Sequence, residues 1–416
     1  MPDKLVVIGA GAAGVFCAVN AARLNPLMEV VILEKSAKLL SKVKVSGGGR
    51  CNITHDCNSI TEMINRYPRG SSFLKKAFRH FFTSDTVAWF EQRGVQLKTE
   101  ADGRMFPVTD SSQTVIDCLL KEAEKYKVNI IRNAAVASVE KAGTHWQIQS
   151  AAGTIVSDYI CVATGGVSGM PWLNCIQVFG HHIETPAPSL FTFNMPGNSI
   201  TELMGISSGH VAVKIAGTKW QQTGALLITH WGLSGPAILR LSAWAAKDLA
   251  RKNYEFSIMV NWLPEFNETS LLARMQQLRF SMASQKIMNR NPFGLPARLW
   301  EYFLKTAEIK EDTRWADLPA KSQNKLVKIL CAQDFSVKGK TTFKEEFVTA
   351  GGVSLQEIDV DTMQSKLVAG LFFAGEVIDV DGITGGYNFQ NAWTTGWIAA
   401  NGIVQRSKHN IVTAEP

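Results

Sequence analysis

The segment KLVVIGAGAAG near the start of the chain constrains the fold more than any other stretch of the sequence. Residues 4–8 form the short apolar run of a buried parallel strand, and Gly9, Gly11 and Gly14 follow it in the spacing GxGxxG. In such a turn the first glycine makes the tight bend, the second admits a pyrophosphate, and the third lets helix and strand approach. With a helix expected over residues 12–24, the segment predicts a dinucleotide site at a helix N-terminus.

A second strand with a carboxylate at its end strengthens this interpretation. Residues 29–33 (EVVIL) have the pattern of the next strand, and Glu34 closes it 20 residues after Gly14. A carboxylate at this position hydrogen-bonds the ribose hydroxyls of an adenosine half in doubly wound folds. The alternative is a glycine-rich turn followed by an unrelated surface glutamate. Together the two features favour a dinucleotide, but they do not choose between NAD and FAD.

Three later segments favour FAD. Residues 46–52 (SGGGRCN) contain consecutive glycines whose backbone N–H groups can wrap a diphosphate or a flavin edge, although a surface loop would look similar. An apolar run at 159–162 ends in the small residues 163–166, as expected where a dinucleotide crosses the carboxyl edge of a sheet. After the strand end at 375–376, residues 385–388 open a helix whose N-terminus favours negative charge on a reduced flavin.

The length of the chain indicates more than one domain. A chain of 416 residues with 46% apolar content is expected to form two or three cores. Strands and helices alternate in the first part of the chain. Short strands follow, then a stretch with helical spacing, and the alternation of strands and helices returns at the end. We expect an FAD-binding domain in residues 1–190 and 349–416, an inserted β-rich domain in residues 191–265 with a return strand at 334–348, and a helical subdomain in residues 266–333.

Composition argues against several classes of protein. No stretch reaches the roughly 18 consecutive apolar residues of a membrane span, and the N-terminal apolar run is too short for an export signal. We therefore expect a soluble, cytoplasmic protein. The seven cysteines lack CxxC or Cys/His spacing, so we expect neither a disulfide framework nor a metal site. The net charge of +7 is dispersed, so we expect a generally basic surface rather than a nucleic-acid partner.

Five long motifs carry a resemblance to a known family. The motifs GAGAAG, SGGGRCNIT, ITHWGLSGPAIL, FVTAGGVSLQEIDVDTMQSKL and GLFFAGEVIDVDGITGGYNFQNAW are similar to those of bacterial YhiN-like, BaiN-like or aminoacetone oxidase-like flavoproteins. The resemblance covers essentially the whole chain and departs at Asn391, where a large apolar residue is expected. It implies noncovalent FAD in a two-part Rossmann-type α/β domain, interrupted by a β-barrel-like domain and a small helical domain. Because members carry different activities, it does not identify a substrate.

The turns and strand ends described above supply the candidate site residues. The expected FAD-binding residues are Gly9, Gly11, Ala12, Ala13, Gly14, Glu34, Lys35, Ser46, Gly47, Gly48, Gly49, Arg50, Cys51, Asn52, Val136, Ala163, Thr164, Gly165, Gly166, Gly375, Glu376, Gly385, Gly386, Tyr387, Asn388 and Gln390. His230, at the end of an expected strand, is a candidate acid or base, with a structural histidine as the alternative. Cys51 is a candidate reactive thiol beside Arg50, with packing against the flavin as the alternative.

These features predict an FAD-dependent oxidoreductase that transfers a hydride between flavin and a small organic substrate. The reaction is either amine oxidation or reduction of a C=C or C=O bond, and the oxidase and reductase directions stay open. NAD(P)H is a candidate transient donor, although no second GxGxxG is present. Two alternatives are an RNA-modifying flavoprotein, suggested by the positive charge, and a flavin-binding regulatory protein without turnover. The sequence leaves the oligomeric state open.

Overall fold

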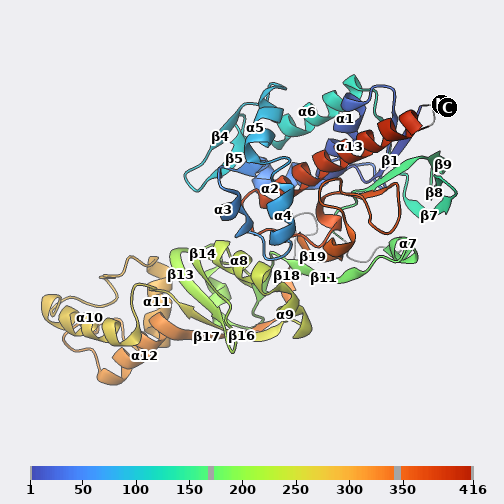
Figure 1. Cartoon of the computed structure of the whole chain (residues 1–416). Helices are drawn as coiled ribbons and strands as arrows, with labels where there is room; N and C mark the ends of the chain where they lie inside the picture. The colour runs from blue at the N-terminus through green and yellow to red at the C-terminus, as the bar shows by residue number, and fades with distance from the viewer. Residues whose placement is uncertain (1, 167–172, 342–347, 414–416) are drawn as a thin grey trace. The chain divides into compact units, whose positions relative to one another are not determined.

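The computed structural model describes residues 2–166, 173–341 and 348–413. The chain divides into two compact units (Figure 1): unit 1 contains residues 1–188 and 343–416, and unit 2 contains residues 189–342. Residues 342–347 of the expected return segment lie outside the described residues. The finer domain boundaries given above stay a prediction.

A five-stranded parallel sheet forms the centre of unit 1. Its strand order is β20-β10-β1-β2-β6, and each neighbouring pair runs parallel. The strands are β1 (Lys4–Ile8), β2 (Glu29–Leu33), β6 (Asn129–Ile131), β10 (Tyr159–Val162) and β20 (Leu371–Phe373). Apolar runs such as β10 are buried along their whole length because both faces of the sheet are covered. Segments from both ends of the chain thus share one sheet, which confirms the expected Rossmann-type α/β fold.

Helices α1 (Ala12–Leu24) and α13 (Tyr387–Thr413) pack against each other in unit 1 (Figure 1). Gly396 permits this approach, since a Cβ on it would lie 2.8 Å from the Ala13 carbonyl oxygen. The other helices of unit 1 are α2 (Ser41–Gly49), α3 (Ile60–Ile64), α4 (Ser71–Ala77), α5 (Thr83–Glu91), α6 (Ser112–Lys125), α7 (Leu173–Val178), and the 3₁₀ helices η2 (Leu355–Glu357) and η3 (Gly375–Val377).

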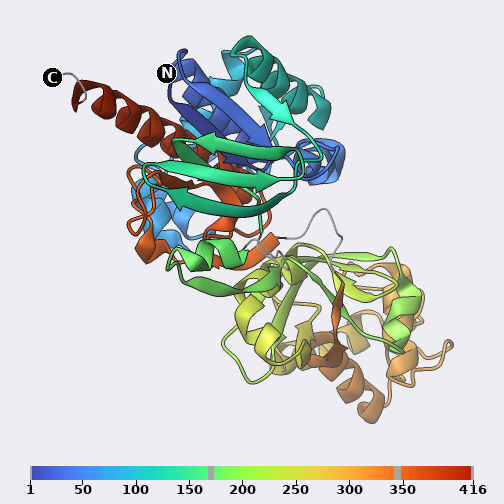
Figure 2. The ribbon, with the colours of Figure 1, turned by 90° about the vertical axis from the view of Figure 1, so that its right-hand side faces the viewer.

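Three small sheets complete unit 1. Their strand orders are β3-β5-β4, β7-β8-β9 and β11-β19. The strands are β3 (Thr54–His55), β4 (Leu97–Thr99), β5 (Arg104–Pro107), β7 (Val136–Ala142), β8 (His145–Ser150), β9 (Gly153–Ser157), β11 (Ile183–Ser189) and β19 (Val348–Val353). The sheet of β7, β8 and β9, coloured green in Figure 2, contacts β1 and β10 of the central sheet.

Unit 2 is built on one seven-stranded antiparallel sheet of order β17-β16-β13-β14-β15-β12-β18. The strands are β12 (Thr192–Asn194), β13 (Ser207–Ile215), β14 (Gln221–Ile228), β15 (Gly232–Ser234), β16 (Glu255–Asn261), β17 (Gln333–Lys338) and β18 (Lys340–Thr341). The edge strands β17 and β18 follow each other in the chain, but among the described residues no ladder joins them. The expected β-barrel-like domain is therefore not confirmed, since the described strands do not form a closed sheet.

The helices of unit 2 share one core with its sheet. They are η1 (Ser199–Leu203), α8 (Pro236–Trp244), α9 (Ala246–Arg251), α10 (Glu268–Ser281), α11 (Ala297–Thr306) and α12 (Ala320–Ala332). One cluster of buried side chains runs from Val213 on the sheet to Trp300 on α11 and Leu330 on α12. The helical segment that the sequence indicated is thus continuous with the β-rich part, because both bury their apolar residues in the same interior.

Within the described residues, none of the helices combines the length and apolarity that a bilayer crossing requires. The same residues hold no cluster of three or more His, Cys, Asp or Glu side chains arranged to bind a metal ion.

Candidate cofactor site

Four of the five parallel strands of unit 1 end in residues that the sequence assigned to FAD. β1 is followed by Gly9, β2 by Glu34 and β10 by Ala163, and β20 leads into Gly375. Because the strands are parallel, these ends lie at one edge of the sheet, where open α/β sheets bind their ligands.

The three glycines of the first turn meet different steric limits. Gly9 has φ +107°, and a Cβ on it would lie 2.6 Å from the Ala163 carbonyl oxygen. A Cβ on Gly14 would lie only 2.0 Å from the Gly9 carbonyl oxygen, so strand and helix meet there backbone to backbone. A Cβ on Gly11 meets nothing within 4 Å. Gly11 is the N-cap of α1, and among the described residues no side chain caps this helix, so its first N–H groups keep donor capacity for a phosphate.

Glu34 is held in place at the end of β2. Its Oε2 accepts a hydrogen bond from the Ala10 N–H at 2.9 Å, and its Oε1 accepts one from the Ser36 N–H at 2.9 Å. These bonds orient the carboxylate and leave acceptor capacity for ribose hydroxyls. The Ala134 N–H donates to the Glu34 carbonyl at 2.8 Å, which brings the start of β7, at Val136, toward this strand end. Lys35 is exposed beside it.

The glycine-rich segment after Glu34 forms the kinked end of helix α2. It is not a free surface loop. Ser46, Gly47 and Gly48 have non-helical backbone angles, with positive φ at the two glycines. A Cβ on Gly47 would lie 2.9 Å from the Phe106 ring, whereas Gly48 and Gly49 face open space. The segment therefore offers an accessible glycine backbone to a ligand on one side and packs tightly on the other.

Arg50 is engaged within the protein. Its Nη1 donates to Glu100 Oε1 at 2.6 Å and lies 3.6 Å from Asp110 Oδ1. Its guanidinium also lies 4.0 Å from the centre of the Phe106 ring. The hydrogen bond to Glu100 raises the pKa of Arg50. The charge of Arg50 is thus balanced by neighbouring carboxylates, so it contributes less to a diphosphate than the sequence suggests.

Cys51 and Asn52 are built into the structure of the site. Cys51 is fully buried at φ +60°, and burial raises the pKa of its thiol to about 12. A thiol with this pKa is protonated at neutral pH, which speaks against a nucleophilic role and favours packing. Oriented to satisfy its neighbours, the Asn52 amide donates to the Thr54 carbonyl and accepts from the Gly386 N–H at 2.8 Å. Asn52 thereby ties the glycine-rich segment to the start of α13.

Glu376 lies where several parts of the site meet. Its Oε1 accepts the Thr349 N–H at 2.7 Å, and its Oε2 accepts from Lys42 Nζ at 2.5 Å. A Cβ on Gly166 would lie 2.1 Å from Thr349 Oγ1 and 2.8 Å from Glu376 Oε1. The Thr349 hydroxyl is buried and has no hydrogen-bond partner among the described residues, and a bound polar ligand would satisfy it. A Cβ on Gly375 would lie 2.7 Å from Ala13 Cβ, so this turn touches the first turn of α1.

The start of α13 combines ligand-facing and structural residues. A Cβ on Gly386 would lie 2.5 Å from the Thr54 carbonyl, so only glycine fits there. The Asn388 side chain donates to and accepts from Gly382, both at 2.8 Å, and closes its own loop. Gln390 is fully buried and accepts from the hydroxyls of Thr54 and Thr86. Asn388 and Gln390 therefore hold the helix start together rather than face an open space.

His55 is a residue that the sequence reasoning missed. Its ring stacks on Tyr387 with ring centres 4.8 Å apart, and its Nδ1 lies 3.1 Å from the Gly385 carbonyl oxygen. Burial lowers the pKa of His55, which keeps the imidazole neutral near pH 7. The available signal was its position three residues after Asn52, directly downstream of the glycine-rich motif.

His230 belongs to unit 2, at the turn between β14 and β15. It is exposed, and its ring lies 4.4 Å from the ring of Trp231, which is also exposed. Its role at a flavin stays a prediction.

The donors and spaces of unit 1 fit an FAD molecule. Gly11, Gly48 and Gly49 leave open backbone, Glu34 is oriented for a ribose, and the buried hydroxyl of Thr349 has no partner within the described part of the chain. Each feature lies where a dinucleotide that crosses the carboxyl edge of the sheet would need it. Residues from both ends of the chain contribute.

Comparison with known proteins places this geometry among flavoproteins. The family model described as HI0933-like protein Rossmann domain matches residues 3–402. Ribosomal RNA dihydrouridine synthase of Escherichia coli (strain K12) is 31% identical, over 96% of this chain and 97% of that protein. The protein of the same name from Haemophilus influenzae is 29% identical, over 95% and 97%. A 3-dehydro-bile acid delta(4,6)-reductase of Clostridium scindens is 25% identical, over 97% and 100%.

Two solved structures share the fold. A chain of Escherichia coli quinol fumarate reductase matches with a TM-score of 0.52 at 14% identity, over 99% of this chain and 71% of that chain. A 3-ketosteroid-delta4-(5alpha)-dehydrogenase from Rhodococcus jostii matches with a TM-score of 0.50 at 13% identity, over 96% and 97%.

Proposed function

The chain belongs to the HI0933-like family of flavin-dependent oxidoreductases, and we propose from this premise that it reduces a carbon–carbon double bond conjugated to a carbonyl group. We propose further that the double bond is the C5=C6 bond of a uracil in ribosomal RNA, so that the product is dihydrouridine. The observation that carries the proposal is the nearly full-length similarity to two ribosomal RNA dihydrouridine synthases.

The names of the curated relatives describe one type of chemistry. Dihydrouridine is uridine with a saturated C5=C6 bond, and a delta(4,6)-reductase saturates ring double bonds of a bile acid. In uracil the C4 carbonyl polarises this bond, so C6 accepts a hydride and C5 then takes a proton. FAD in its reduced form would supply the hydride, and a nicotinamide such as NADPH would restore it. On this ground we favour a reductase over an amine oxidase.

The residues of unit 1 contribute binding and orientation. Gly11 and the N-terminus of α1 accommodate a pyrophosphate, and Glu34 binds a ribose. Glu376 and Thr349 bind polar groups at the strand edge, and the N-terminus of α13 adds partial positive charge there. Binding and electrostatic orientation are what a protein supplies when a cofactor performs the electron transfer.

The distribution of charge supports an RNA substrate. Residues 189–342 contain 19 Lys and Arg against 11 Asp and Glu, a net charge of +8. The rest of the chain contains 24 against 25, a net charge of −1. The positive charge of the protein is therefore concentrated in unit 2, whereas the overall charge of +7 suggested a diffuse basic surface. A basic unit in the same chain as a flavin domain suits a polyanionic substrate, so we place RNA above a small molecule.

The test is anaerobic turnover with RNA. The holoprotein is incubated with NADH or NADPH and with ribosomal RNA transcribed in vitro, and nucleosides from the digested RNA are analysed by mass spectrometry. We expect dihydrouridine to form only when the holoprotein and a reduced nicotinamide are both present. A Gly11→Val variant, whose side chain would occupy the space expected for a phosphate without meeting a described atom within 4 Å of its Cβ, serves as the control without bound cofactor.

A small cyclic enone is the second candidate substrate, because of the similarity to the bile-acid reductase. A 4-en-3-oxo steroid is added in place of RNA, and reoxidation of the flavin is followed by absorbance. Turnover of the steroid without dihydrouridine formation would favour this second candidate. Absence of turnover with both substrates would contradict double-bond reduction as the function.

A further inference from the structure

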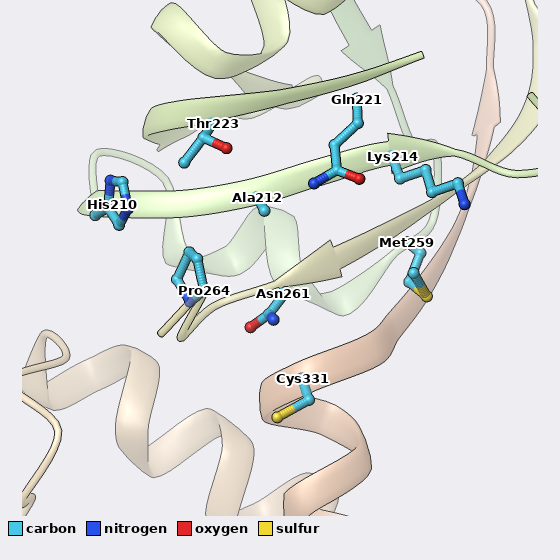
Figure 3. A pocket seen from close by; sticks show the side chains of 9 residues that line it. All are labelled: His210, Ala212, Lys214, Gln221, Thr223, Met259, Asn261, Pro264 and Cys331. Carbon is cyan, nitrogen blue, oxygen red and sulfur yellow. The ribbon is translucent and has the colours of Figure 1, made fainter. Parts of the chain in front are cut away.

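A polar groove on the sheet of unit 2 is lined by none of the residues assigned to the cofactor site above. It has a cavity volume of about 430 Å³, within the range of roughly 300–1,000 Å³ for small-ligand sites. Its walls come from β13, β14, β16 and the end of α12 (Figure 3). The lining residues are His210, Ala212, Lys214, Gln221, Thr223, Met259, Asn261, Pro264 and Cys331.

Strand register explains why these side chains share one face. Lys214 pairs with Gln221 on β14, and Ala212 lies between Thr223 on one side and Asn261 on the other. Side chains directly opposite each other in a sheet point to the same face. The alternating residues of β13, such as Val213, are buried in the core. The groove is therefore the outer face of a sheet whose inner face is fully packed.

The polar groups of the groove are available to a ligand. His210, Lys214, Gln221 and Thr223 are all exposed. Within the part of the chain that the structure describes, no hydrogen bond or ion pair engages the side chains of these four residues. Asn261, in contrast, is fixed, because it donates to the Phe266 carbonyl at 3.0 Å and accepts the Leu263 N–H at 2.9 Å. The groove thus combines a rigid wall with free donors and acceptors.

The chemistry of the groove matches one nucleotide of a single strand. Lys214 is a point charge suited to a phosphate, and the amide of Gln221 can pair with a base edge. The imidazole of His210 can stack on a base, and the hydroxyl of Thr223 can bond a 2′-hydroxyl. Surfaces that bind single-stranded RNA combine positive charge with rings on which bases stack, and Lys214 and His210 supply these two elements here. The net charge of +8 on unit 2 would attract such a strand to the groove.

We propose that this groove binds a single-stranded segment of the RNA substrate, with Lys214 at a phosphate and Gln221, Thr223 and His210 at the nucleoside. The assignment rests on the proposed function, because that function supplies the RNA. It adds a binding site in unit 2, separate from the cofactor cradle of unit 1.

The test measures binding of a fluorescent oligouridine of about 12 nucleotides, a length within the usual range of single-strand sites. The holoprotein is titrated by fluorescence anisotropy at several salt concentrations. Lys214→Ala should weaken binding roughly fourfold at physiological salt and lower the salt slope by about 0.7, the share of one phosphate contact on a single strand. Lys214→Arg should retain the wild-type affinity.

Two further variants make the test independent of folding defects. Asp334 is exposed on β17 and pairs in register with Met259 of the groove, so it repels a phosphate there. Asp334→Asn should therefore strengthen binding, which a folding defect would not do. The matched control is Lys321→Ala, which removes one exposed lysine from the first turn of α12, away from the groove. It should leave the affinity within about twofold, since removing one distant charge changes only the general attraction.

The outcomes separate the groove from the proposed function. If Lys214→Ala and Lys321→Ala bind the oligouridine equally well, or if the wild-type protein does not bind it, the groove assignment is wrong. Dihydrouridine formation by the wild-type protein is scored independently of these affinities. Loss of binding in Lys214→Ala without any dihydrouridine formation in the wild type would retain the groove and overturn the proposed function.

Discussion

At the scale of single residues, the first turn shows how one motif carries separate physical requirements. Gly14 is required by the fold, because its Cβ would collide with the Gly9 carbonyl oxygen. Gly11 has no such neighbour within 4 Å, so the protein alone does not require glycine there. A requirement at Gly11 therefore has to come from the ligand.

This difference predicts two outcomes for one kind of substitution. Gly11→Ala should leave the melting temperature of the cofactor-free protein unchanged and weaken FAD binding at least tenfold, or about 1.4 kcal/mol, because the methyl group occupies phosphate space. Gly14→Ala should lower both. Absorbance ratios of flavin to protein and thermal unfolding measure the two effects. Equal loss of stability in both variants would contradict the separation of roles.

Cys51 leads to a prediction about reactivity and pH. Burial raises its pKa to about 12, so the thiolate forms only as the pH approaches that value, far above neutrality. Iodoacetamide should therefore not modify Cys51 in the native protein near neutral pH. Cys57, which is partly exposed, provides the internal control and should be modified first, as located by peptide mass spectrometry.

The same reasoning predicts that Cys51→Ala keeps its turnover within about twofold of wild type, because alanine fills a small buried position without the thiol. A loss of turnover that leaves the flavin content and stability unchanged would instead support the reactive thiol suggested by the sequence.

At the scale of elements, the contact between α1 and α13 joins the two ends of the chain. Gly396 lets the backbones meet, since its Cβ would lie 2.8 Å from the Ala13 carbonyl oxygen and 3.4 Å from the Cys17 nitrogen. The contact lies at the first turn of α1, where the phosphates are expected. Packing of these helices and the geometry of the cofactor site are therefore coupled.

Gly396→Val should push the two helices apart and lower the free energy of unfolding by about 1–3 kcal/mol, the usual cost of overpacking. It should also weaken FAD binding, because the first turn of α1 moves with the helix. Lys408→Val places the same side chain at an exposed position of α13 and serves as the control. Chemical denaturation and flavin retention measure both effects. Wild-type FAD binding in a destabilised Gly396→Val protein would argue against the coupling.

At the scale of the whole molecule, the chain separates cofactor binding from positive charge. The residues that we assign to FAD lie in unit 1, which has a net charge of −1, whereas unit 2 has a net charge of +8 and a core of its own. If the proposed groove in unit 2 binds the substrate, the same type of flavin domain can serve different substrates, because cofactor and substrate are then bound by different units.

Two units with separate cores predict two steps in thermal unfolding. Added FAD should raise the midpoint of the unit 1 transition only, by the equivalent of about 2.7 kcal/mol at a hundredfold excess over Kd. Differential scanning calorimetry with and without FAD measures this shift. A single cooperative transition that moves as a whole would show instead that the two units unfold together.

The sequence by itself determined the class of the cofactor-binding domain. The glycine spacing around Gly9, the position of Glu34 and the late motif at Gly375 predicted a Rossmann-type flavoprotein, and the family match confirms it. These features were readable because close backbone approach and ribose binding restrict residue types locally. Only the tertiary structure showed that Arg50 is balanced by Glu100, that Cys51 is buried, and that His55 stacks at the start of α13.

The groove proposed to bind RNA could be recognised only in the tertiary structure. Lys214, Gln221 and Asn261 come from three strands, and no motif connects them in the sequence. Their meeting follows from strand register within a sheet that, among the described residues, is not confirmed as the expected barrel. Long-range strand pairing is decided by the packing of the whole sheet, because each strand alone is compatible with several partners and registers.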